Sequence, residues 1–479
     1  MSRILVISPN VSDAVLGCSG MLVKHVAAGD DVRLMILGDG ITSRARSLEI
    51  GLQAIDLSIL EEQGRAALAQ LGIYSVEFFR LPDNRLDQVP LLDLVKTIEA
   101  TKIRFQPDVV YTTSDCDLGI DQKRTCLATV TAFRPQPGDN QAALYAFEVR
   151  SSTEWNFCER DRIFLPDTFV DISSTLQDKL KAFQALTLEQ RQVNHARSVE
   201  AIVDHARLRG SHVGLEAAEA FMLLRAVRQV ENNSAGAQRC VLAVVAHPDD
   251  ETLGCGGALA AWAKAGAQTH VLCLADGETA RFYDRSAPEA VVRIAARREA
   301  ARKSVAILGL SSIRFLDFPD NRLDGVDLLD VIRPIEALIR ELKPDTIYTH
   351  HGGDLNLDHR VAHQAVTTAC RPLPGRSVQR VYSFETPSST DWATESHGPV
   401  FRANLFVDIS AHLGAKIASL QAYDEEMHPF PHPRSLEGVS VLARQRGACV
   451  GVAAAEAFML VRELYASGTP SDELSGVAD

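Results

Sequence analysis

The sequence of 479 residues lacks the features of several large protein classes. It has no uninterrupted apolar stretch long enough to span a bilayer, so no transmembrane segment is expected. Basic residues are in the minority, since 49 lysines and arginines face 62 aspartates and glutamates. The resulting net charge of -13 argues against nucleic acid or an anionic membrane as the main partner.

Paired cysteines and a leader segment are also missing. The nine cysteines are scattered and form no C-x-x-C pair, which is typical of reduced thiols and excludes a thiolate zinc site. The first residues, MSRILVISPN, have neither the apolar core nor the small-residue cleavage site of a signal peptide. They have the pattern of a first β-strand. These features predict a cytoplasmic protein.

What the sequence does contain is a long internal repeat with a period of 237 residues. The repeated motifs are PDNRLD at Pro82 and Pro319, SSTEW and SSTDW at Ser151 and Ser388, VDIS at Val170 and Val407, and AEAFML at Ala218 and Ala455. A repeat of this length is a whole domain. We place the boundary in the polar stretch QVENNSAGAQR, which predicts domains at 1–230 and 238–467 and a disordered tail at 468–479.

Each copy alternates short apolar runs with helical stretches. The strand-like runs are RILVIS, DVRLMILG, VEFFRL and DVVYTT in the first copy, and CVLAVVA, THVLCLA, IRFLDF and DTIYTH in the second. Near-continuous apolar strands between helices imply a mostly parallel sheet covered on both faces. The sequence therefore predicts two tandem Rossmann-like, doubly wound α/β domains with ligands at the carboxyl ends of the strands. The alanine-rich segment that ends each copy is predicted to be helical.

Acidic side chains and histidines follow two of these strands in the second copy. The stretch VVAHPDDETLGCGG carries His247, Asp249, Asp250 and Glu251 directly after an apolar run. The second loop, THHGGDLNLDHR, carries His350, His351, Asp354, Asp358 and His359. Loops that follow separate strands of a doubly wound sheet can converge. Histidine and carboxylate side chains together suit a divalent metal such as zinc, with an open position for hydrolysis.

Two other interpretations of the acidic loop are weaker. Aspartate and glutamate are favoured at helix N-termini, but capping needs one acid rather than three and a histidine. The run LGCGG resembles a phosphate-binding glycine loop, yet the G-x-G-x-x-G spacing is incomplete and the preceding acids would repel a pyrophosphate. We instead expect these glycines to let a helix pack closely on the sheet.

At these two loops the second copy, over roughly residues 238–465, resembles the PIG-L (LmbE-like) family of deacetylases, which remove N-acetyl groups from amino sugars and related amides. The resemblance rests on AHPDDETLGCGG and DLNLDHR. It implies the LmbE-like fold and a Zn²⁺ ion, with Fe²⁺ as an alternative, held by His247, Asp250 and His359. It also implies that Asp249 is the general base and that Asp358 lies behind His359 and orients it.

The sequence departs from the family pattern at one position. Where many members have a histidine, this chain has Asn356, whose amide can donate a hydrogen bond to an oxyanion but cannot act as an acid. His350 or His351 could substitute, or either could be a buried strand-end histidine. The resemblance also implies substrate contacts by Arg297 and Asp320. A solvent-exposed helix position for Arg297 and a turn role for Asp320 remain open alternatives.

The first copy has lost most of the predicted site. The residues at the matching positions are Asn10 for His247, Ser12 for Asp249, Asp13 for Asp250, Gly119 for Asn356 and Gln122 for His359. The predicted base and two of three ligands are therefore absent, whereas PDNRLD, SSTEW and AEAFML persist. We expect the first copy to be non-catalytic and to pair with the second within the chain, or to bind a glycan without a metal.

The sequence as a whole predicts a zinc-dependent hydrolase that removes an N-acetyl group from an amino sugar or a sugar conjugate. Its partner would be an N-acetylated glycoconjugate substrate, and a homo-oligomer is possible. Two alternatives remain open. One is a non-enzymatic sugar-binding or scaffold protein derived from the same fold, and the other is a hydrolase of a different small amide.

Overall fold

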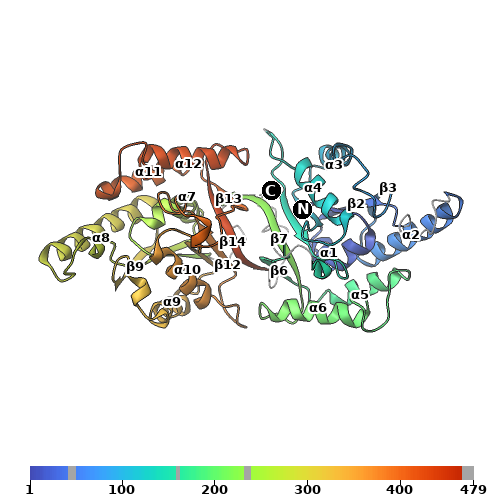
Figure 1. Cartoon of the computed structure of the whole chain (residues 1–479), viewed down its shortest axis with the longest axis horizontal. Helices are drawn as coiled ribbons and strands as arrows, with labels where there is room; N and C mark the ends of the chain where they lie inside the picture. Colours follow the sequence, from blue (N-terminus) through green and yellow to red (C-terminus); the bar gives the residue numbers. More distant parts are fainter. Residues whose placement is uncertain (41–49, 137, 158–161, 231–238, 466–479) are drawn as a thin grey trace. The chain divides into compact units, whose positions relative to one another are not determined.

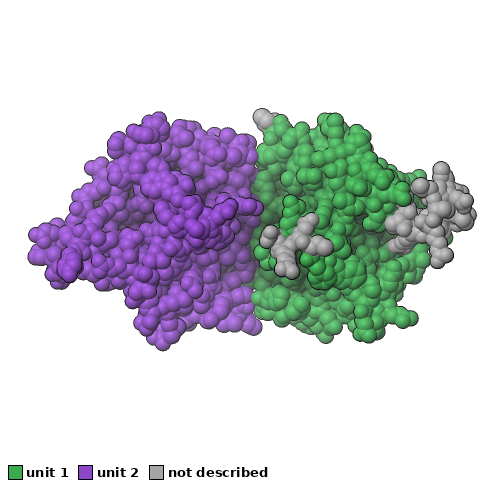
Figure 2. Space-filling model, in the orientation of Figure 1, with its two compact units in different colours: residues 1–226, 464–479 green, residues 227–463 purple. Residues whose placement is uncertain are grey.

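The computed structural model describes residues 1–40, 50–136, 138–157, 162–230 and 239–465. The chain divides into two compact units, which are Met1–Ala226 with Leu464–Asp479, and Val227–Glu463 (Figure 2). The predicted linker at 231–237 and the predicted tail at 468–479 lie outside the described residues. Each unit is an α/β domain in which helices flank a twisted sheet (Figure 1).

The second unit is built on the strand order β10-β9-β8-β11-β12-β14-β13. Strands β10 to β12 of this order are parallel, and β14 pairs antiparallel with both β12 and β13. Its elements are β8 (Cys240–Val245), α7 (Asp250–Lys264), β9 (Gln268–Ala275), α8 (Pro288–Leu308), β10 (Ser312–Phe318), α9 (Leu328–Leu342), β11 (Thr346–His350), α10 (Leu357–Ala369), β12 (Arg380–Phe384), β13 (Leu405–Asp408), α11 (Leu413–Leu420), α12 (Leu436–Ala448) and β14 (Ala455–Tyr465).

The first unit repeats this design with the strand order β3-β2-β1-β4-β5-β7, and β6 pairs antiparallel with β7. Its elements are β1 (Arg3–Ser8), α1 (Val11–Ala27), β2 (Asp31–Gly38), α2 (Ile50–Gln70), β3 (Ser75–Leu81), α3 (Leu91–Phe105), β4 (Val109–Thr113), α4 (Ile120–Ala132), β5 (Ala143–Phe147), β6 (Thr168–Asp171), α5 (Leu176–Ala185), α6 (Val199–Ser211) and β7 (Ala218–Arg228). All eight apolar runs singled out in the sequence are strands, which confirms the doubly wound α/β class.

The helices lie on both faces of each sheet, as the apolar pattern requires. In the second unit α9 and α10 pack against each other over a buried cluster that includes Leu242, Leu272 and Ile335. On the other face α7 contacts α8 and α11. A side chain at Gly254 of α7 would come within 2.1 Å of the Phe384 ring, so the glycine is needed for close packing, as expected.

The prediction of a helix at the end of each copy was wrong. The AEAFML segments form β7 and β14, which pair with two neighbouring strands each. Glu456 at the start of β14 explains why the segment recurs, because its carboxylate accepts hydrogen bonds from the Gly257 and Ala258 amides and pairs with buried Lys416. Tertiary pairing therefore overrides the helix propensity of alanine.

One buried ion pair recurs in both units. Glu219 and Lys179 repeat the buried ion pair of Glu456 and Lys416 in the first unit. This shared contact fixes the first helix of each unit behind its first strand.

In the part of the chain that the structure describes, no helix combines the length and the apolar character needed to cross a membrane.

Candidate active site

The two loops predicted from the sequence lie side by side in the second unit because β8 and β11 are neighbouring parallel strands. The acidic loop leaves β8 and enters α7 at Asp249, whose φ of +133° lies in a region that residues other than glycine rarely adopt. Such strain persists where the surroundings fix it, and it clusters at functional sites. The second loop leads from β11 into α10, which carries His359 in its first turn.

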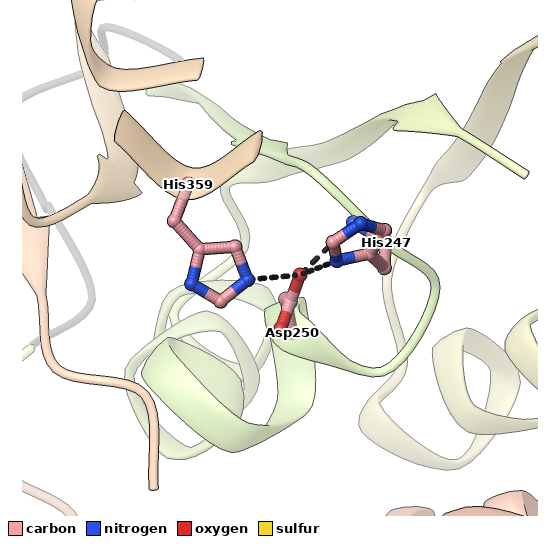
Figure 3. A group of neighbouring side chains, drawn as sticks. All are labelled: His247, Asp250 and His359. Carbon is pink, nitrogen blue, oxygen red and sulfur yellow. Dashed lines mark hydrogen bonds and ion pairs between the residues drawn. The ribbon is translucent and has the colours of Figure 1, made fainter. Parts of the chain in front are cut away.

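Three buried side chains converge at this edge of the sheet (Figure 3). The candidate ligand atoms of His247, Asp250 and His359 all lie within 4.8 Å of one another. Asp250 Oδ2 is central, at 3.3 Å from His247 Nδ1 and 3.4 Å from His359 Nε2. The structure therefore brings the three predicted metal ligands together.

Carboxylates on the far side of each imidazole fix which nitrogen faces the centre. His247 Nε2 lies 3.1 Å from both Asp358 Oδ2 and Asp320 Oδ1. His359 Nδ1 lies 3.1 Å from Asp354 Oδ1. A proton held on each outer nitrogen leaves the inner lone pairs of His247 Nδ1 and His359 Nε2 free for a metal.

The carboxylate behind His359 is therefore Asp354 and not Asp358, which corrects the sequence-based expectation. Asp354 follows β11 and accepts hydrogen bonds from the hydroxyls of Ser389 and Thr390, which hold it in place. Asp358 instead contacts His247 and accepts hydrogen bonds from the backbone amides of Asn321 and Leu323. Although Asp358 precedes His359 directly, helix geometry turns successive side chains in different directions.

The unpartnered atoms of this cluster fit a cation. Among the described residues, Asp250 Oδ1 and both ring nitrogens of His359 are fully buried and have no hydrogen-bond partner, although His359 Nδ1 lies close to Asp354. Buried polar atoms without a partner are rare and call for an explanation such as a bound ion. Two imidazole nitrogens and a carboxylate make a mixed donor set that suits zinc or iron.

Electrostatics around the cluster supports the same assignment. Burial alone would raise the pKa of Asp250, but the imidazoles of His359 and His350 hold it well below its usual range. Burial lowers the pKa of His359, while the carboxylates of Asp250 and Asp354 raise it, with a net value of about 9. The cluster thus balances its negative charge with protons on imidazole, and a divalent cation would have to displace them.

Asp249, the predicted base, is buried beside these ligands. Its Oδ2 is held by Arg297 at 3.2 Å and by Arg434 at 3.3 Å. Its Oδ1 has no hydrogen-bond partner among the described residues. Burial raises the pKa of Asp249, and the two guanidinium groups oppose this rise. The carboxylate is therefore oriented through one oxygen and available through the other.

A cavity of about 260 Å³ opens in front of Asp249. It is lined by His247, Asp249, Gly277, Ala280, Arg281, Arg297, Asp320, Asn321, Asn356, Glu426 and Arg434. This lining joins one predicted ligand and the predicted base to charged side chains from several different segments. A small polar substrate could reach both groups from this cavity.

The two histidines that follow one another at the end of β11, His350 and His351, are both held by hydrogen bonds. His350 is fully buried: its Nε2 accepts a hydrogen bond from the Ala246 amide at 2.9 Å, and its ring stacks on His359. It does not line the cavity, so the geometry favours a packing role over the catalytic role expected for it. His351 is likewise engaged, with its Nε2 at 2.7 Å from the Pro399 carbonyl.

Asn356 lines the cavity and also caps α10. Its Oδ1 accepts a hydrogen bond from the Asp358 amide, and its Nδ2 donates to Asn321 Oδ1 at 3.1 Å. Asp320 lines the cavity while its Oδ1 faces His247. Arg297 is buried in the cavity wall between Asp249 and Glu426 rather than exposed on its helix.

Sequence reasoning assigned no role to Arg434, Glu426 or Asp354. Arg434 recurs in the first copy as Arg197, although that copy has lost the predicted base and two of the three predicted ligands. Yet Arg434 contacts Asp249, and Arg197 lies 3.6 Å from Asp13, which is the counterpart of the neighbouring Asp250. A residue kept in both copies can therefore still belong to the site.

The cluster is not reproduced in the first unit. Both groups of three candidate metal ligands in the described part of the chain belong to the second unit. At the matching position of the first unit, Gln122 Nε2 donates a hydrogen bond to Asp13 Oδ2 at 2.7 Å. An amide–carboxylate hydrogen bond thus occupies the place of the metal ligands.

Comparison with known proteins gives the same two segments. A family model described as PIG-L, GlcNAc-PI de-N-acetylase, matches residues 5–133 and again residues 242–370, which together are more than half of the chain. Each matched segment runs from the first strand of its unit to the end of α4 or α10. Both copies of the repeat are thus recognised by one model.

Three relatives show the range of activities named among similar proteins. The uncharacterized deacetylase YaiS of Escherichia coli (strain K12) is 32% identical over 162 residues, which are 33% of this chain and 79% of that protein. The 1D-myo-inositol 2-acetamido-2-deoxy-alpha-D-glucopyranoside deacetylase of Mycolicibacterium vanbaalenii is 30% identical, covering 41% and 83%. The 4-oxalmesaconate hydratase of Pseudomonas putida is also 30% identical, covering 40% and 75%.

Proposed function

The chain belongs to the PIG-L (GlcNAc-PI de-N-acetylase) family, and we propose that it is a metal-dependent N-deacetylase with one active site, in the domain at 238–467. The observation that carries this proposal is the convergence of His247, Asp250 and His359 beside Asp249 at the cavity. Relatives named as deacetylases, one of them for an acetamido sugar conjugate, support amide hydrolysis. We propose an N-acetylated amino sugar or sugar conjugate as substrate.

We propose zinc as the metal, with ferrous iron as the alternative. A divalent cation at this site would polarise the amide carbonyl and lower the pKa of the attacking water. His247, Asp250 and His359 would hold it, and the carboxylates of Asp320, Asp358 and Asp354 keep the outer imidazole nitrogens protonated. The chain's own contribution is thus a prearranged set of ligand atoms, from which a bound cation would displace the inner imidazole protons.

Asp249 is the general base in this proposal. Its unpartnered Oδ1 accepts the proton of water as the oxygen attacks the amide carbon, while Arg297 and Arg434 keep the carboxylate oriented through Oδ2. The amide of Asn356 lines the cavity and can donate a hydrogen bond to the developing oxyanion. Because Asn356 has no proton to release, Asp249 returns its proton to the leaving amine.

A second candidate is the addition of water to a carboxylate-bearing substrate. Arg281, Arg297 and Arg434 line the cavity, and guanidinium groups bind carboxylates well. A hydratase among the relatives supports this alternative. Each of the three arginines, however, already pairs with an acid of the protein, namely Glu278, Glu426 or Asp249. We therefore place deacetylation first.

The test is to measure metal content and acetate release of the full chain and of Asp249→Asn. The variant is expected to keep its metal and to lose about two to four orders of magnitude in kcat, since the amide cannot accept a proton. The matched control is Asp317→Asn, an acid of the same unit whose side chain is 84% exposed. Near-normal acetate release by a metal-loaded Asp249→Asn would exclude Asp249 as the base. Water addition without acetate release would favour the hydratase.

A further inference from the structure

The first unit keeps a cavity where the second unit has its candidate active site. Its volume is about 220 Å³, close to the 260 Å³ of the second. The lining residues are Asn10, Ser12, Asp13, Gly40, Asp83, Asn84, Gly119, Asp121, Gln122, Ser151, Ser152, Glu189 and Arg197. All of them except the two glycines are polar or charged. The volume is below the roughly 300–1,000 Å³ of pockets for drug-sized ligands, so the cavity suits a single small ring.

The side chains that replaced the catalytic ones left the cavity open and polar. Ser12 stands in place of Asp249 and Gly119 in place of Asn356, and both are smaller. Gln122 is 8% exposed, yet its Oε1 has no hydrogen-bond partner among the described residues. A domain with a purely structural role would be more stable if apolar groups filled such space, because buried polar atoms without partners cost free energy. The open hydrogen-bonding capacity indicates a ligand instead.

The lining residue Arg197 is linked by a backbone hydrogen bond to an aromatic pair, His195 and Trp155. Arg197 Nε donates to Ser151 Oγ at 2.6 Å, and the Arg197 amide donates to His195 Nδ1 at 3.0 Å. The His195 ring contacts Trp155 edge to face at 5.8 Å, and Trp155 is 40% exposed. An exposed indole beside a polar cavity offers an apolar face and one donor, which suits a ring with both kinds of surface.

An apolar slot of about 50 Å³ adjoins the polar cavity. The two share Asn10, Ser12, Gly40 and Glu189. The apolar part of its lining comes from Val11, Ile36, Leu57, Leu60, Phe78 and Leu186, and Gly38, Asp39, Glu61 and Gln63 complete it. Leu60 and Leu186 stand where the second unit has Arg297 and Tyr423. The first unit thus replaces two polar side chains of the second by an apolar recess that could hold a methyl group.

We propose that the first unit binds an N-acetylated pyranose without a metal, with the ring in the polar cavity and the acetyl methyl in the apolar slot. Hydroxyl groups both donate and accept hydrogen bonds, so they can pair with the carboxamide, carboxylate and hydroxyl side chains that line the cavity. The choice of an acetylated sugar rests on the function proposed for the second unit, whereas the existence of the site rests on the first unit alone.

Tryptophan fluorescence of the full chain tests this binding separately from catalysis. The chain has three tryptophans, of which Trp155 and Trp392 are exposed and Trp262 donates to Tyr348. Trp392→Phe leaves Trp155 as the reporter of the first unit, and Trp155→Phe is the matched control that reports the second. Both are made with Asp249→Asn to stop turnover, and they are titrated with N-acetylglucosamine and with glucosamine.

We expect Trp155 emission to change saturably with N-acetylglucosamine and the change to persist in a metal chelator. The response to glucosamine should be at least about tenfold weaker, because glucosamine lacks the acetyl group, whose methyl alone discriminates by that order when it is buried. A Cβ at position 119 would lie 1.9 Å from Gln122 Oε1, so Gly119→Ala should weaken the response at least about tenfold. Its backbone φ of -66° accommodates alanine. Leu60→Glu, on a different element, should remove the preference for the acetylated sugar.

Two results would overturn the proposal. One is a Trp155 emission that does not respond to either sugar, which would make the cavity an empty relic. The other is a response that Gly119→Ala and Leu60→Glu leave unchanged in folded chains, which would place the sugar outside the cavity. Acetate release by the unmodified chain is measured in parallel. Failure of the proposed deacetylase would appear in that assay, and failure of this site in the fluorescence.

Discussion

The two units hold an aspartate at the same position, but the side chains around it differ. In the second unit, Asp250 faces two imidazoles, and in the first, Asp13 accepts a hydrogen bond from Gln122. Around these sites the framework is unchanged: Asp121 accepts hydrogen bonds from the Asn84 and Leu86 amides, as Asp358 does from its own PDN turn. The framework is therefore kept, whereas the side chains that could hold a metal or accept a proton differ.

The pKa values follow this difference. Imidazoles around Asp250 hold its pKa well below the usual range despite burial. Burial raises the pKa of Asp13 to about 7, because Arg197 and Gln122 only partly offset it. A buried carboxylate without cations is costly, and one with them is stabilised. The second site is thus organised around positively charged side chains, and the first keeps Arg197 but neither imidazole.

The largest expected effect comes from giving the second unit the residue of the first. His359→Gln removes one of three ligands, so we expect loss of the bound metal and a fall in acetate release of at least about a thousandfold. Metal analysis and the acetate assay measure both. Gln122→His is the reciprocal change, and it should bind no metal because Asn10 still stands in place of His247. Stoichiometric metal in His359→Gln would refute the ligand assignment.

A smaller effect is expected from the carboxylate behind His359. Asp354→Asn leaves an acceptor for the imidazole N–H but removes the charge, so metal affinity or activity should fall about 10–100-fold. The counterpart is Asp117, which accepts from Ser152 and Thr153 as Asp354 does from Ser389 and Thr390. Asp117→Asn should change stability alone. Zinc affinity by chelator competition measures the contrast, and equal losses in both variants would contradict it.

The fold and the meeting of the two loops were predictable because they depend on local patterns. Apolar runs such as CVLAVVA are strands because a covered parallel sheet buries every residue, and β8 is buried throughout. The carboxyl ends of β8 and β11 meet because the strands are neighbours, and this follows from the doubly wound class. That topology brings the two loops together, and the resemblance to the PIG-L family implied which of their side chains are the ligands, namely His247, Asp250 and His359.

The contacts around the ligands were not predictable because they depend on side-chain directions across the fold. Asp354 and Asp358 are both close to His359 in sequence, and the rotation of α10 decides which of them reaches it. His350 ends β11 with its ring under the cluster, where the Ala246 amide engages it. Glu426 and Arg434 come from segments more than 170 residues beyond Asp249, so no local spacing relates them to it. The alanine-rich ends of the two copies were wrongly predicted to be helices, because the strands with which they pair cannot be identified from the local sequence.

The smallest expected effect concerns stability in the first unit. The folded pKa of Asp13 is about 7, against an ordinary value of 3.8, so the folded state binds more protons than the unfolded state between these pH values. Stability should therefore fall as pH rises from about 4 to 7, and the cost is fully present above pH 7. At about 1.4 kcal/mol per pKa unit the upper limit is about 4 kcal/mol. Asp13→Asn removes the charge, while its amide oxygen still accepts a hydrogen bond from Gln122. The variant should therefore raise the free energy of unfolding at pH 8 by about 1–3 kcal/mol. At pH 5 it should leave the free energy of unfolding little changed. Urea denaturation at both pH values measures this, and a variant that is less stable at pH 8 would show that Arg197 compensates the charge of Asp13 fully.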